Sequence, residues 1–566
     1  VRICNYEPKY AKGIAEMWNN SGEGWNNQVF NYDEEHILKE EANGTSFAVY
    51  LALYEDQVIG YVNLKQEAED IAYLETLTVL PTFHGLKVGK ALMQRCVMKT
   101  AELGIPGLSL FTSAGNTKAV PLYKKCGFFW QKMDEPCTFL VNFLPYVINN
   151  ELLKPYFEYF DWYQDLVRDL RLEPDGEERD GHIYYTYLWQ KADRSLKVVY
   201  DKVSRCISEI ENNDFYICLR AANPRPIYGS EQTLSIRYEC FNPLYQDISV
   251  TGIPEHNILI DYQQQAKCAS TLDLEAKYTC SHLRRRFTSW DAHPAVKCKI
   301  ILNGKSITMG VSQLACAPVK LGLSVQNPVR AHQVRTLYLD LESNLEQDAI
   351  INLHFPVHPK LRVVNPDLQI PLISRTLLTK EIDFICEGSC YYTPVVTAEY
   401  LVKGSAAQSF EMYPELIVNS TKGVDAVRAD YQAVMLAGQY EFRLPLREQK
   451  NWGYFQGESL IIRPSDFGRP FSDEFETEDA IDICLGTAMD SAWMEVFYES
   501  KKHPGLKFSR YFHLDMSGEL HYLLRFQNIP EEATQLRLRE LVGPDNRCFS
   551  FMSEHGLIRK EKNSHR

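Results

Sequence analysis

The stretch LETLTVLPTFHGLKVGKALM, residues 74–93, decides the fold of the N-terminal part of this chain. An apolar strand is expected to run into a loop, His84 to Gly89, and the loop leads into a helix whose apolar residues recur at helical spacing. The first turn of a helix leaves backbone N–H groups without partners, and the helix dipole favours negative charge there. Since Lys87 and Lys90 add positive charge, the stretch predicts a binding site for a pyrophosphate.

A second stretch, LSLFTSAGNTKAVPLYKKCGF at residues 108–128, predicts another strand followed by a short helix. Asn116 opens that helix, and Gly127 ends it, which is a common place for glycine. A strand, a loop, a helix, a strand and a helix in this order indicate an α/β unit over residues 1–148. Closing strands are expected after Phe128.

These two stretches resemble the GNAT (Gcn5-related) N-acyltransferase family. The family's loop, Gln/Arg-x-x-Gly-x-Gly/Ala, matches His84 to Gly89 by register, with histidine at its first position and Lys87 where glycine is usual. The family's later motif is Asn-x-x-Ala-x-x-Leu-Tyr-x-x-x-Gly-Phe. It is matched in full by Asn116, Ala119, Leu122, Tyr123, Gly127 and Phe128.

The resemblance covers about the first quarter of the chain and implies binding of acetyl-CoA as co-substrate. The residues that it assigns to the pyrophosphate are His84, Gly85, Leu86, Lys87, Val88, Gly89 and Lys90. Backbone groups of Leu77 and Val79 would meet the pantetheine arm, and Asn116 would contact the coenzyme or cap its own helix. The Cβ of Lys87 would hold the backbone further from a phosphate than glycine does.

In the resembling family an amine attacks the acyl thioester directly, so two proton transfers need residues. Glu75 lies nine residues before His84, where many relatives carry an acid, and it would remove a proton directly or through water. The alternative is a glutamate that ion-pairs with or caps a neighbour. Tyr123 falls on the family's tyrosine, which protonates or hydrogen-bonds the coenzyme sulfur; the alternative is a core aromatic residue.

Composition excludes several other classes of function. The 566 residues carry a net charge of −14, which argues against broad binding to nucleic acid or anionic membranes. We interpret the basic triplet at 284–286 as a solvated turn, and no apolar run approaches the ~18 residues that span a bilayer. Fifteen dispersed cysteines, without Cys-x-x-Cys pairs, predict reduced thiols and a cytoplasmic protein.

No metal site is expected. His354 and His358 invite a metal interpretation, but Pro356 between them prevents a helix from fixing their geometry, so strand-end histidines are the better interpretation.

The rest of the chain is expected to form a multidomain protein with a helical and strand connector and two to three antiparallel β-sandwiches. The connector, residues 149–229, is aromatic-rich, with helices expected over 151–172 and 201–212. From about residue 230 apolar residues alternate with polar ones in short strands, which is typical of antiparallel sandwiches. We place a sandwich at 230–320, an immunoglobulin-like sandwich at 321–425 and a β-rich domain at 426–566.

Three functions follow as hypotheses. The leading one is an N-acyltransferase whose β-sandwiches recognise an amine-bearing acceptor: a protein, a peptide or an amino sugar. The second is a binding or scaffold protein with a degenerate GNAT domain. The third is a sugar-processing C-terminal part, in which Trp452, Tyr454 and Phe455 would line a cleft, although an aromatic core strand and turn is the better interpretation of these residues. The sequence does not define the oligomeric state.

Overall fold

The structure is a computed structural model with two compact units, Val1–Cys316 and Ala317–Arg566, which are described separately. It describes the whole chain apart from residues 26, 114, 133–136, 180, 256, 283–290, 447–451, 457–459, 463–479, 500–504, 528–541, 545–549, 554–555 and 560–566. The basic triplet at 284–286 therefore lies outside the described residues.

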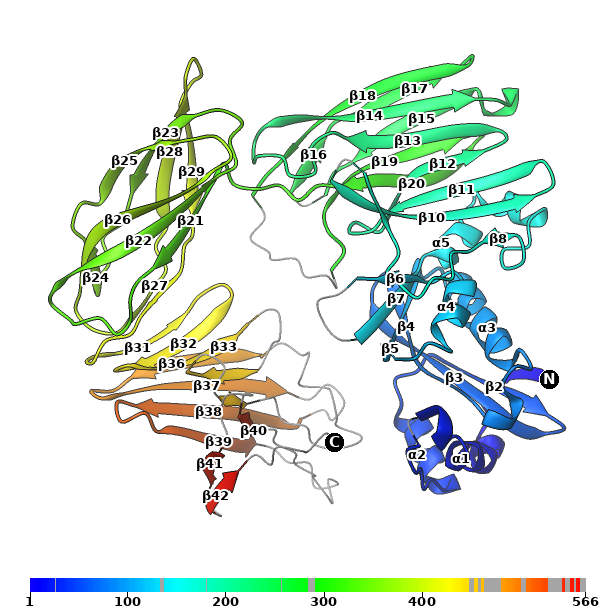
Figure 1. The fold of residues 1–566 in the computed structure, drawn as a ribbon, viewed down its shortest axis with the longest axis horizontal. Helices are drawn as coiled ribbons and strands as arrows, with labels where there is room; N and C mark the ends of the chain where they lie inside the picture. The colour runs from blue at the N-terminus through cyan, green and yellow to red at the C-terminus, as the bar shows by residue number, and fades with distance from the viewer. Residues whose placement is uncertain are drawn as a thin grey trace. The chain divides into compact units, whose positions relative to one another are not determined.

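The N-terminal part of the first unit is a sheet of seven described strands (Figure 1). In spatial order the strands are β1 (Arg2–Asn5), β2 (Ala48–Tyr54), β3 (Gln57–Ala68), β4 (Ile71–Val79), β5 (Gly107–Ser113), β7 (Cys137–Asn142) and β6 (Phe129–Gln131). The helices are α1 (Ala11–Asn19), α2 (Glu34–Asn43), α3 (Val88–Glu102), α4 (Val120–Lys125) and α5 (Leu144–Asn149). Figure 1 shows α1 and α2 on the opposite side of this sheet from α3 and α4.

Local sequence explains several of these elements. The carboxylate of Asp33 accepts a hydrogen bond of 2.8 Å from the backbone N–H of His36 and so caps α2. Glu55 and Asp56 both have positive φ, 48° and 66°, as a two-residue turn between hairpin strands requires. The strands and helices expected over residues 1–148 are therefore present.

The sheet opens between β4 and β5, and this opening positions the candidate site. The two strands pair in parallel only from Ile71–Gly107 to Tyr73–Ser109, although β4 continues to Val79. Glu75 is an extra residue in β4, because Asn63 pairs with Thr76 while the next residue of β3 pairs with Leu74. A bulge of this kind bends the strand and redirects a side chain.

The second sheet of this unit contains thirteen described strands. They are β8 (Leu166–Val167), β9 (Glu177–Arg179), β10 (His182–Lys191), β11 (Arg194–Asp201), β12 (Cys206–Asn212), β13 (Phe215–Ala221), β14 (Glu231–Cys240), β15 (Asp247–Ile253), β16 (Ile258–Ile260), β17 (Gln263–Lys267), β18 (Thr271–Cys280), β19 (Ala295–Leu302) and β20 (Lys305–Ser312). Because β13 pairs with β14 along seven residues, the segments 149–229 and 230–320 share one sheet.

Both helices expected in the connector are wrong. Within 151–172 the chain forms a 3₁₀ turn, Lys154–Glu158, and then the short strand β8. The aromatic spacing matched a helix, but the Asp161 carboxylate accepts hydrogen bonds from the N–H groups of Tyr163 and Gln164 and forms a turn instead. Residues 206–212 are strand β12, paired with β11.

The connector's aromatic residues pack on the N-terminal sheet in one continuous core. The ring of Tyr185 stacks on Phe129 with ring centroids 4.5 Å apart. The side chains of Tyr185 and Tyr187 are each 1% exposed. The Tyr187 hydroxyl donates to the carbonyl of Gly127 (2.9 Å) and accepts from the N–H of Phe143 (2.9 Å). This buried hydroxyl fixes the end of the second sequence motif.

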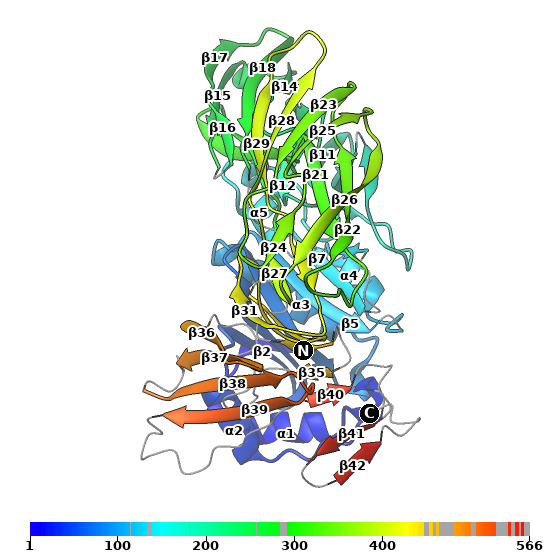
Figure 2. The same ribbon diagram turned by 90° about the vertical axis from the view of Figure 1, so that its left-hand side faces the viewer.

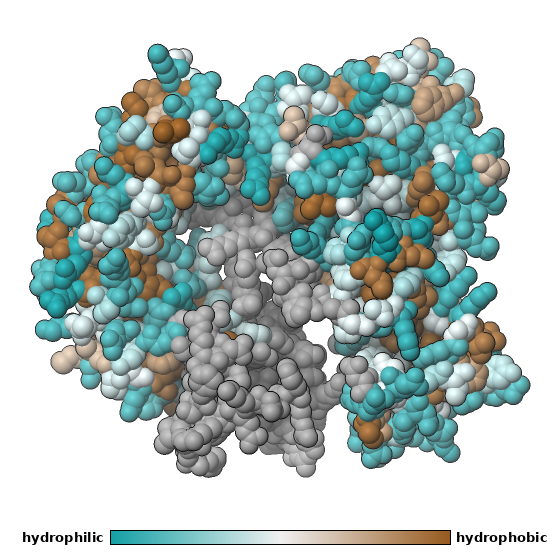
Figure 3. Space-filling model, in the orientation of Figure 1, coloured by the Kyte–Doolittle hydropathy of each residue, from teal (hydrophilic) through white to brown (hydrophobic). Residues whose placement is uncertain are grey.

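The second unit begins with two four-stranded sheets (Figure 1 and Figure 2). One is ordered β21 (Val319–Ser324), β22 (Val334–Ser343), β26 (Leu377–Cys386), β24 (Leu361–Val363); the other is β25 (Asp367–Leu372), β23 (Ala349–His354), β28 (Val396–Val402), β29 (Gln408–Met412). Buried residues alternate with exposed ones along β23, as a sheet with one solvated face requires. Figure 3 shows a mainly hydrophilic surface with small separate hydrophobic groups.

The remaining strands are short pairs and two further sheets. They are β27 (Cys390–Tyr392) with β30 (Leu416–Val418); β31 (Val424–Arg428), β32 (Gln432–Ala437), β33 (Tyr440–Pro445), β34 (Gly453–Phe455), β35 (Leu460–Ile462) and β40 (Val542–Pro544); β36 (Asp482–Thr487), β37 (Ser491–Glu499), β38 (Lys507–Asp515) and β39 (Leu520–Gln527); and β41 (Ser550–Ser553) with β42 (Gly556–Arg559). Tyr454 and Phe455 are therefore sheet residues. Among the described residues, no helix has the length and apolar character needed to cross a bilayer.

Candidate active site

The loop after β4 ends at the first turn of α3, which presents unpaired backbone donors. The first helical hydrogen bond runs from the N–H of Ala91 to the carbonyl of Lys87 at 3.1 Å. The N–H groups of Val88, Gly89 and Lys90 therefore have no acceptor within the helix, and the side chain of Lys87 does not cap them. These donors, with the positive end of a 15-residue helix, suit an anionic group.

Lys87 has a backbone conformation that normally favours glycine. Its φ is 63° and its ψ is 15°, in the left-handed region. A lysine thus occupies a backbone conformation that glycine adopts without steric cost, and the lysine side chain is exposed. Gly85 also has positive φ, 80°, and a Cβ built there would meet no heavy atom within 4 Å.

The remaining loop residues contact the strand end and helices around the opening between β4 and β5. The Nε2 atom of His84 lies 2.9 Å from the carbonyl oxygen of Val79, so the ring ties the loop to the end of β4. A Cβ at Gly89 would lie 3.2 Å from Leu122 of α4, so glycine permits the close packing of α3 against α4. The ammonium of Lys90 lies 3.9 Å from the ring centroid of Tyr163.

Leu77 and Leu86, which were also expected at the coenzyme site, lie in β4 and in the loop after it. Leu77 pairs with Val62 in the β3–β4 ladder, next to the opening, and its side chain is half-buried. Leu86 is 60% exposed, so its contribution to the loop is its backbone.

Glu75 forms an ion pair on the sheet surface. Its carboxylate contacts the ammonium of Lys65 and accepts a hydrogen bond of 2.6 Å from the side-chain amide of Asn63. The ion-pairing alternative from the sequence is thus present in the structure. It does not exclude a role in proton transfer, because 37% of the Glu75 side chain stays exposed.

Tyr123 and Asn116 lie on or next to α4. Tyr123 is 7% exposed, and burial raises the pKa of its hydroxyl to about 12, so the hydroxyl remains protonated and able to donate at neutral pH. The side-chain oxygen of Asn116 accepts a hydrogen bond from the N–H of Ala119 (3.2 Å), and its amide donates to Thr112 (2.8 Å). α4 begins at Val120, so Asn116 does not open the helix as expected; its side chain closes the turn that precedes α4.

The structure adds a second carboxylate that the sequence analysis did not single out. Glu41 of α2 is half-buried and accepts a hydrogen bond of 2.7 Å from the hydroxyl of Tyr61. Burial raises the pKa of Glu41, and the negative charge of Glu75 raises it further. In the sequence Glu41 is one acid of a helix rich in acids, so nothing distinguishes it from a solvated side chain.

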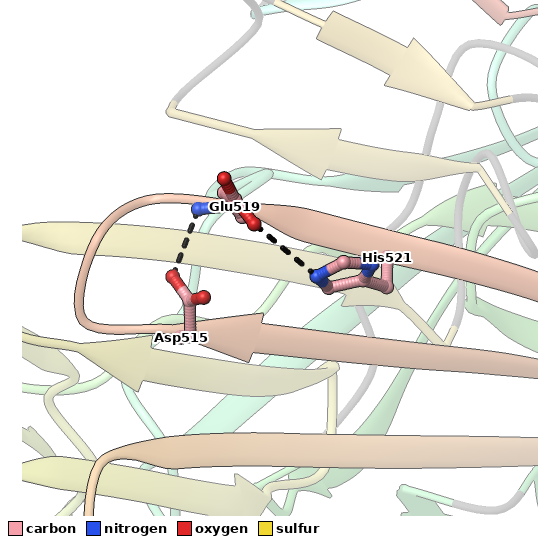
Figure 4. A group of neighbouring side chains, drawn as sticks. All are labelled: Asp515, Glu519 and His521. Atoms are coloured by element: carbon pink, nitrogen blue, oxygen red, sulfur yellow. Dashed lines mark hydrogen bonds and ion pairs between the residues drawn. The ribbon is translucent and has the colours of Figure 1, made fainter. Parts of the chain in front are cut away.

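The one group of metal-type ligands found in the described residues lies in the second unit (Figure 4). Asp515, Glu519 and His521 bring ligand atoms within 4.8 Å of one another. The Asp515 carboxylate already accepts from the N–H groups of Ser517 (2.9 Å) and Glu519 (3.0 Å), which closes the turn between β38 and β39. Turn formation therefore explains the group.

The two histidines considered from the sequence have separate partners. His354 Nδ1 lies 2.7 Å from the carboxylate of Asp367, and the ring of His358 lies edge-on to Tyr392.

Comparison with known proteins identifies the first sheet and its helices. Residues 12–128 match the model of the acetyltransferase (GNAT) family. They form a GNAT acetyltransferase domain. The matched region includes both sequence motifs and the opening between β4 and β5, so the predicted family and the predicted class of enzyme are confirmed.

A curated relative of the GNAT domain is streptothricin acetyltransferase from Escherichia coli. It is 27% identical over 134 residues, which are 24% of this chain and 74% of the relative. Solved structures with similarity include the PaiA N-acetyltransferase of Thermoplasma acidophilum in complex with coenzyme A, at 19% identity, covering 25% of this chain and 97% of that chain, with a TM-score of 0.22. Another is the ribosomal-protein-S18-alanine N-acetyltransferase of Escherichia coli, at 17% identity, covering 25% and 90%, with a TM-score of 0.20.

Proposed function

We propose that the GNAT domain transfers the acetyl group of acetyl-CoA to a primary amine by direct attack. The observation that carries this proposal is the first turn of α3, whose free N–H groups lie beside the opening between β4 and β5 in a domain of an acetyltransferase family. The N–H groups of Val88, Gly89 and Lys90 would bind the pyrophosphate. The edge of β4 at Leu77 and Val79, which does not pair with β5, would meet the pantetheine arm.

The protein's own residues would handle the protons. The amine nitrogen bonds to the thioester carbonyl carbon, and the carbon–sulfur bond then breaks. Glu75 would take the proton lost by the nitrogen, directly or through one water molecule. Tyr123 would give its hydroxyl proton to the leaving thiolate, which its protonated state at neutral pH permits.

The β-rich parts would recognise the acceptor, which we propose is a protein, a peptide or an amino sugar. Support comes from broad depressions on sheet surfaces. One of about 700 Å³ lies over β12, β13, β14 and β18, and its charged lining residues include Glu211, Arg220, Arg237 and Asp273. Another of about 650 Å³ lies over β23, β25, β28 and β29.

Two measurements test the transferase. Calorimetric titration of acetyl-CoA into the intact protein should show binding in the micromolar range, and Gly89→Trp should abolish it because the indole would collide with Leu122. Release of free coenzyme A in the presence of a panel of primary amines should exceed the rate without amine. No binding, or binding without release for any amine, would contradict the proposal.

A binding or scaffold protein is the second candidate. The contact between His84 and the Val79 carbonyl supports it, because His84 would occupy a carbonyl that the resemblance assigns to the pantetheine arm. If this candidate holds, the native protein will not bind acetyl-CoA, and His84→Ala will restore binding.

A further inference from the structure

Four aromatic side chains gather on the face of the sheet that α1 and α2 cover. This aromatic group consists of Trp18, Trp25, Phe30 and Tyr32, and all four are half-buried. The ring centroids of Trp18 and Phe30 are 5.1 Å apart, and those of the two tryptophans are 5.5 Å apart. The indole N–H of Trp25 donates to the hydroxyl of Thr78 at 2.8 Å, so the group is fastened to β4, three residues after Glu75.

Two carboxylates are hydrogen-bonded to side chains of β3 that lie on the same face of the sheet. Tyr61 and Asn63 are two residues apart in the strand, so their side chains point the same way, about 7 Å apart. The Tyr61 hydroxyl bonds Glu41, and the Asn63 amide bonds Glu75. The ring of Tyr61 also lies 6.2 Å from that of Trp18, which places the Glu41 end of this row beside the aromatic group.

The row contains a buried acceptor that has no donor. Asn63 is 5% exposed, and its amide nitrogen donates to both Ser46 (3.0 Å) and Glu75 (2.6 Å). Its Oδ1 atom accepts no hydrogen bond from any described residue. Leaving a buried acceptor unpaired is unfavourable, so this oxygen points to a ligand that donates hydrogen bonds.

The surrounding charge selects the sign of such a ligand. Residues 13–45 contain seven acidic residues and one lysine, which makes the segment that covers this face strongly negative. An ammonium group brings three N–H donors and a positive charge, and it is attracted both to carboxylates and to the faces of tryptophan and tyrosine rings.

We propose that the acceptor amine carries a second ammonium group, that Glu41 and the aromatic group bind that ammonium, and that the Oδ1 atom of Asn63 accepts a hydrogen bond from the reacting amine beside Glu75. The inference rests on the proposed function, because Glu75 marks the end where the reacting amine would lie. Glu41 then holds the distal charge, and the spacing between positions 61 and 63 suits two nitrogens separated by about five carbons. Glu41 is thus assigned a specificity role in acceptor binding.

The test compares two ligands of equal length in calorimetric titrations of the intact protein saturated with coenzyme A. 1,5-Diaminopentane has the second ammonium, and 5-amino-1-pentanol has a neutral hydroxyl in its place. We expect the diamine to bind at least tenfold more tightly. Glu41→Gln, which keeps an acceptor for Tyr61, should reduce that ratio to below threefold while leaving the affinity for the amino alcohol unchanged.

Glu35→Gln is the matched control, because Glu35 lies on the same helix with 76% of its side chain exposed. It should leave the tenfold ratio intact. Equal binding of the two ligands, binding of neither, or the same effect of both substitutions would overturn the proposal. A separate titration of acetyl-CoA decides the proposed function: loss of acetyl-CoA binding would defeat the transferase, whereas diamine binding measured without coenzyme would still report on the ammonium site.

Discussion

Replacing Lys87 by glycine and, in a second variant, by alanine separates the effect of its charge from the effect of its Cβ. The residue has φ of 63°, where an L-residue costs about 1–2 kcal/mol. Glycine removes that cost but adds about 0.5–1 kcal/mol of unfolded-state entropy. The glycine variant should therefore be about 0.5–1 kcal/mol more stable than the native protein, whereas the alanine variant keeps the strained Cβ and gains nothing.

The two variants should lose the same amount of affinity for acetyl-CoA. Lys87 is exposed, so its charge contributes about 0.5–1 kcal/mol to binding a pyrophosphate, or a factor of about two to five. Because the left-handed backbone already presents the N–H groups and the side chain is exposed, the Cβ should not obstruct the phosphate. Both variants lose only the charge.

Titration calorimetry with acetyl-CoA at low and high salt measures the affinity of each variant. Scanning calorimetry measures the stability of each variant from the unfolding transition whose temperature acetyl-CoA shifts. High salt should reduce the difference between the native protein and either variant, because exposed charges are screened. The reasoning is refuted if Lys87→Gly binds tenfold or more tightly than Lys87→Ala, since the Cβ would then be the obstacle.

Tyr123→Phe should lower kcat by about 100-fold and leave the KM for acetyl-CoA nearly unchanged, and an unchanged kcat would remove Tyr123 from the mechanism. Because the pKa of Tyr123 is about 12, the pH–rate profile of the native protein should show no loss of activity from this group up to pH 10. Burial opposes ionisation of Asp201, but hydrogen bonds from His182, Ser204 and Ser312 outweigh it and lower its pKa. The stability from this group is therefore present above the unfolded pKa of about 4 and lost as pH falls through the folded value, so Asp201→Asn should flatten the acid limb of a stability–pH curve. A fragment of residues 1–148 should unfold at a lower temperature than residues 1–316 by circular dichroism, because it lacks the buried hydrogen bonds of Tyr187; equal melting would contradict this.

The GNAT domain could be predicted because its signals are local. The motif from Asn116 to Phe128 encodes a turn closed by Asn116, an amphipathic helical turn and a terminating glycine within thirteen consecutive residues. The alternation of apolar and polar residues along β23 is a local signal in the same way, and it allowed the β-rich modules to be predicted. Propensity and period act over a few residues, so a reader of the sequence can recover them.

Tertiary structure decided what depends on residues distant in the chain. The aromatic spacing from Tyr159 onwards is that of a helix. The chain forms a turn there because Asp161 accepts backbone hydrogen bonds and the carbonyl of Trp162 accepts one from Trp189 of β10. The β3–β4 register places Lys65 beside Glu75, where the two form an ion pair. Glu41 accepts a hydrogen bond from Tyr61, which lies 20 residues away in the sequence. Side-chain pairing of this kind is set by packing and register, which no local propensity encodes. The sequence by itself therefore determined an acetyltransferase domain followed by β structure, while the fold determined which side chains pair with Glu41 and Glu75 and which tyrosine supports the motif.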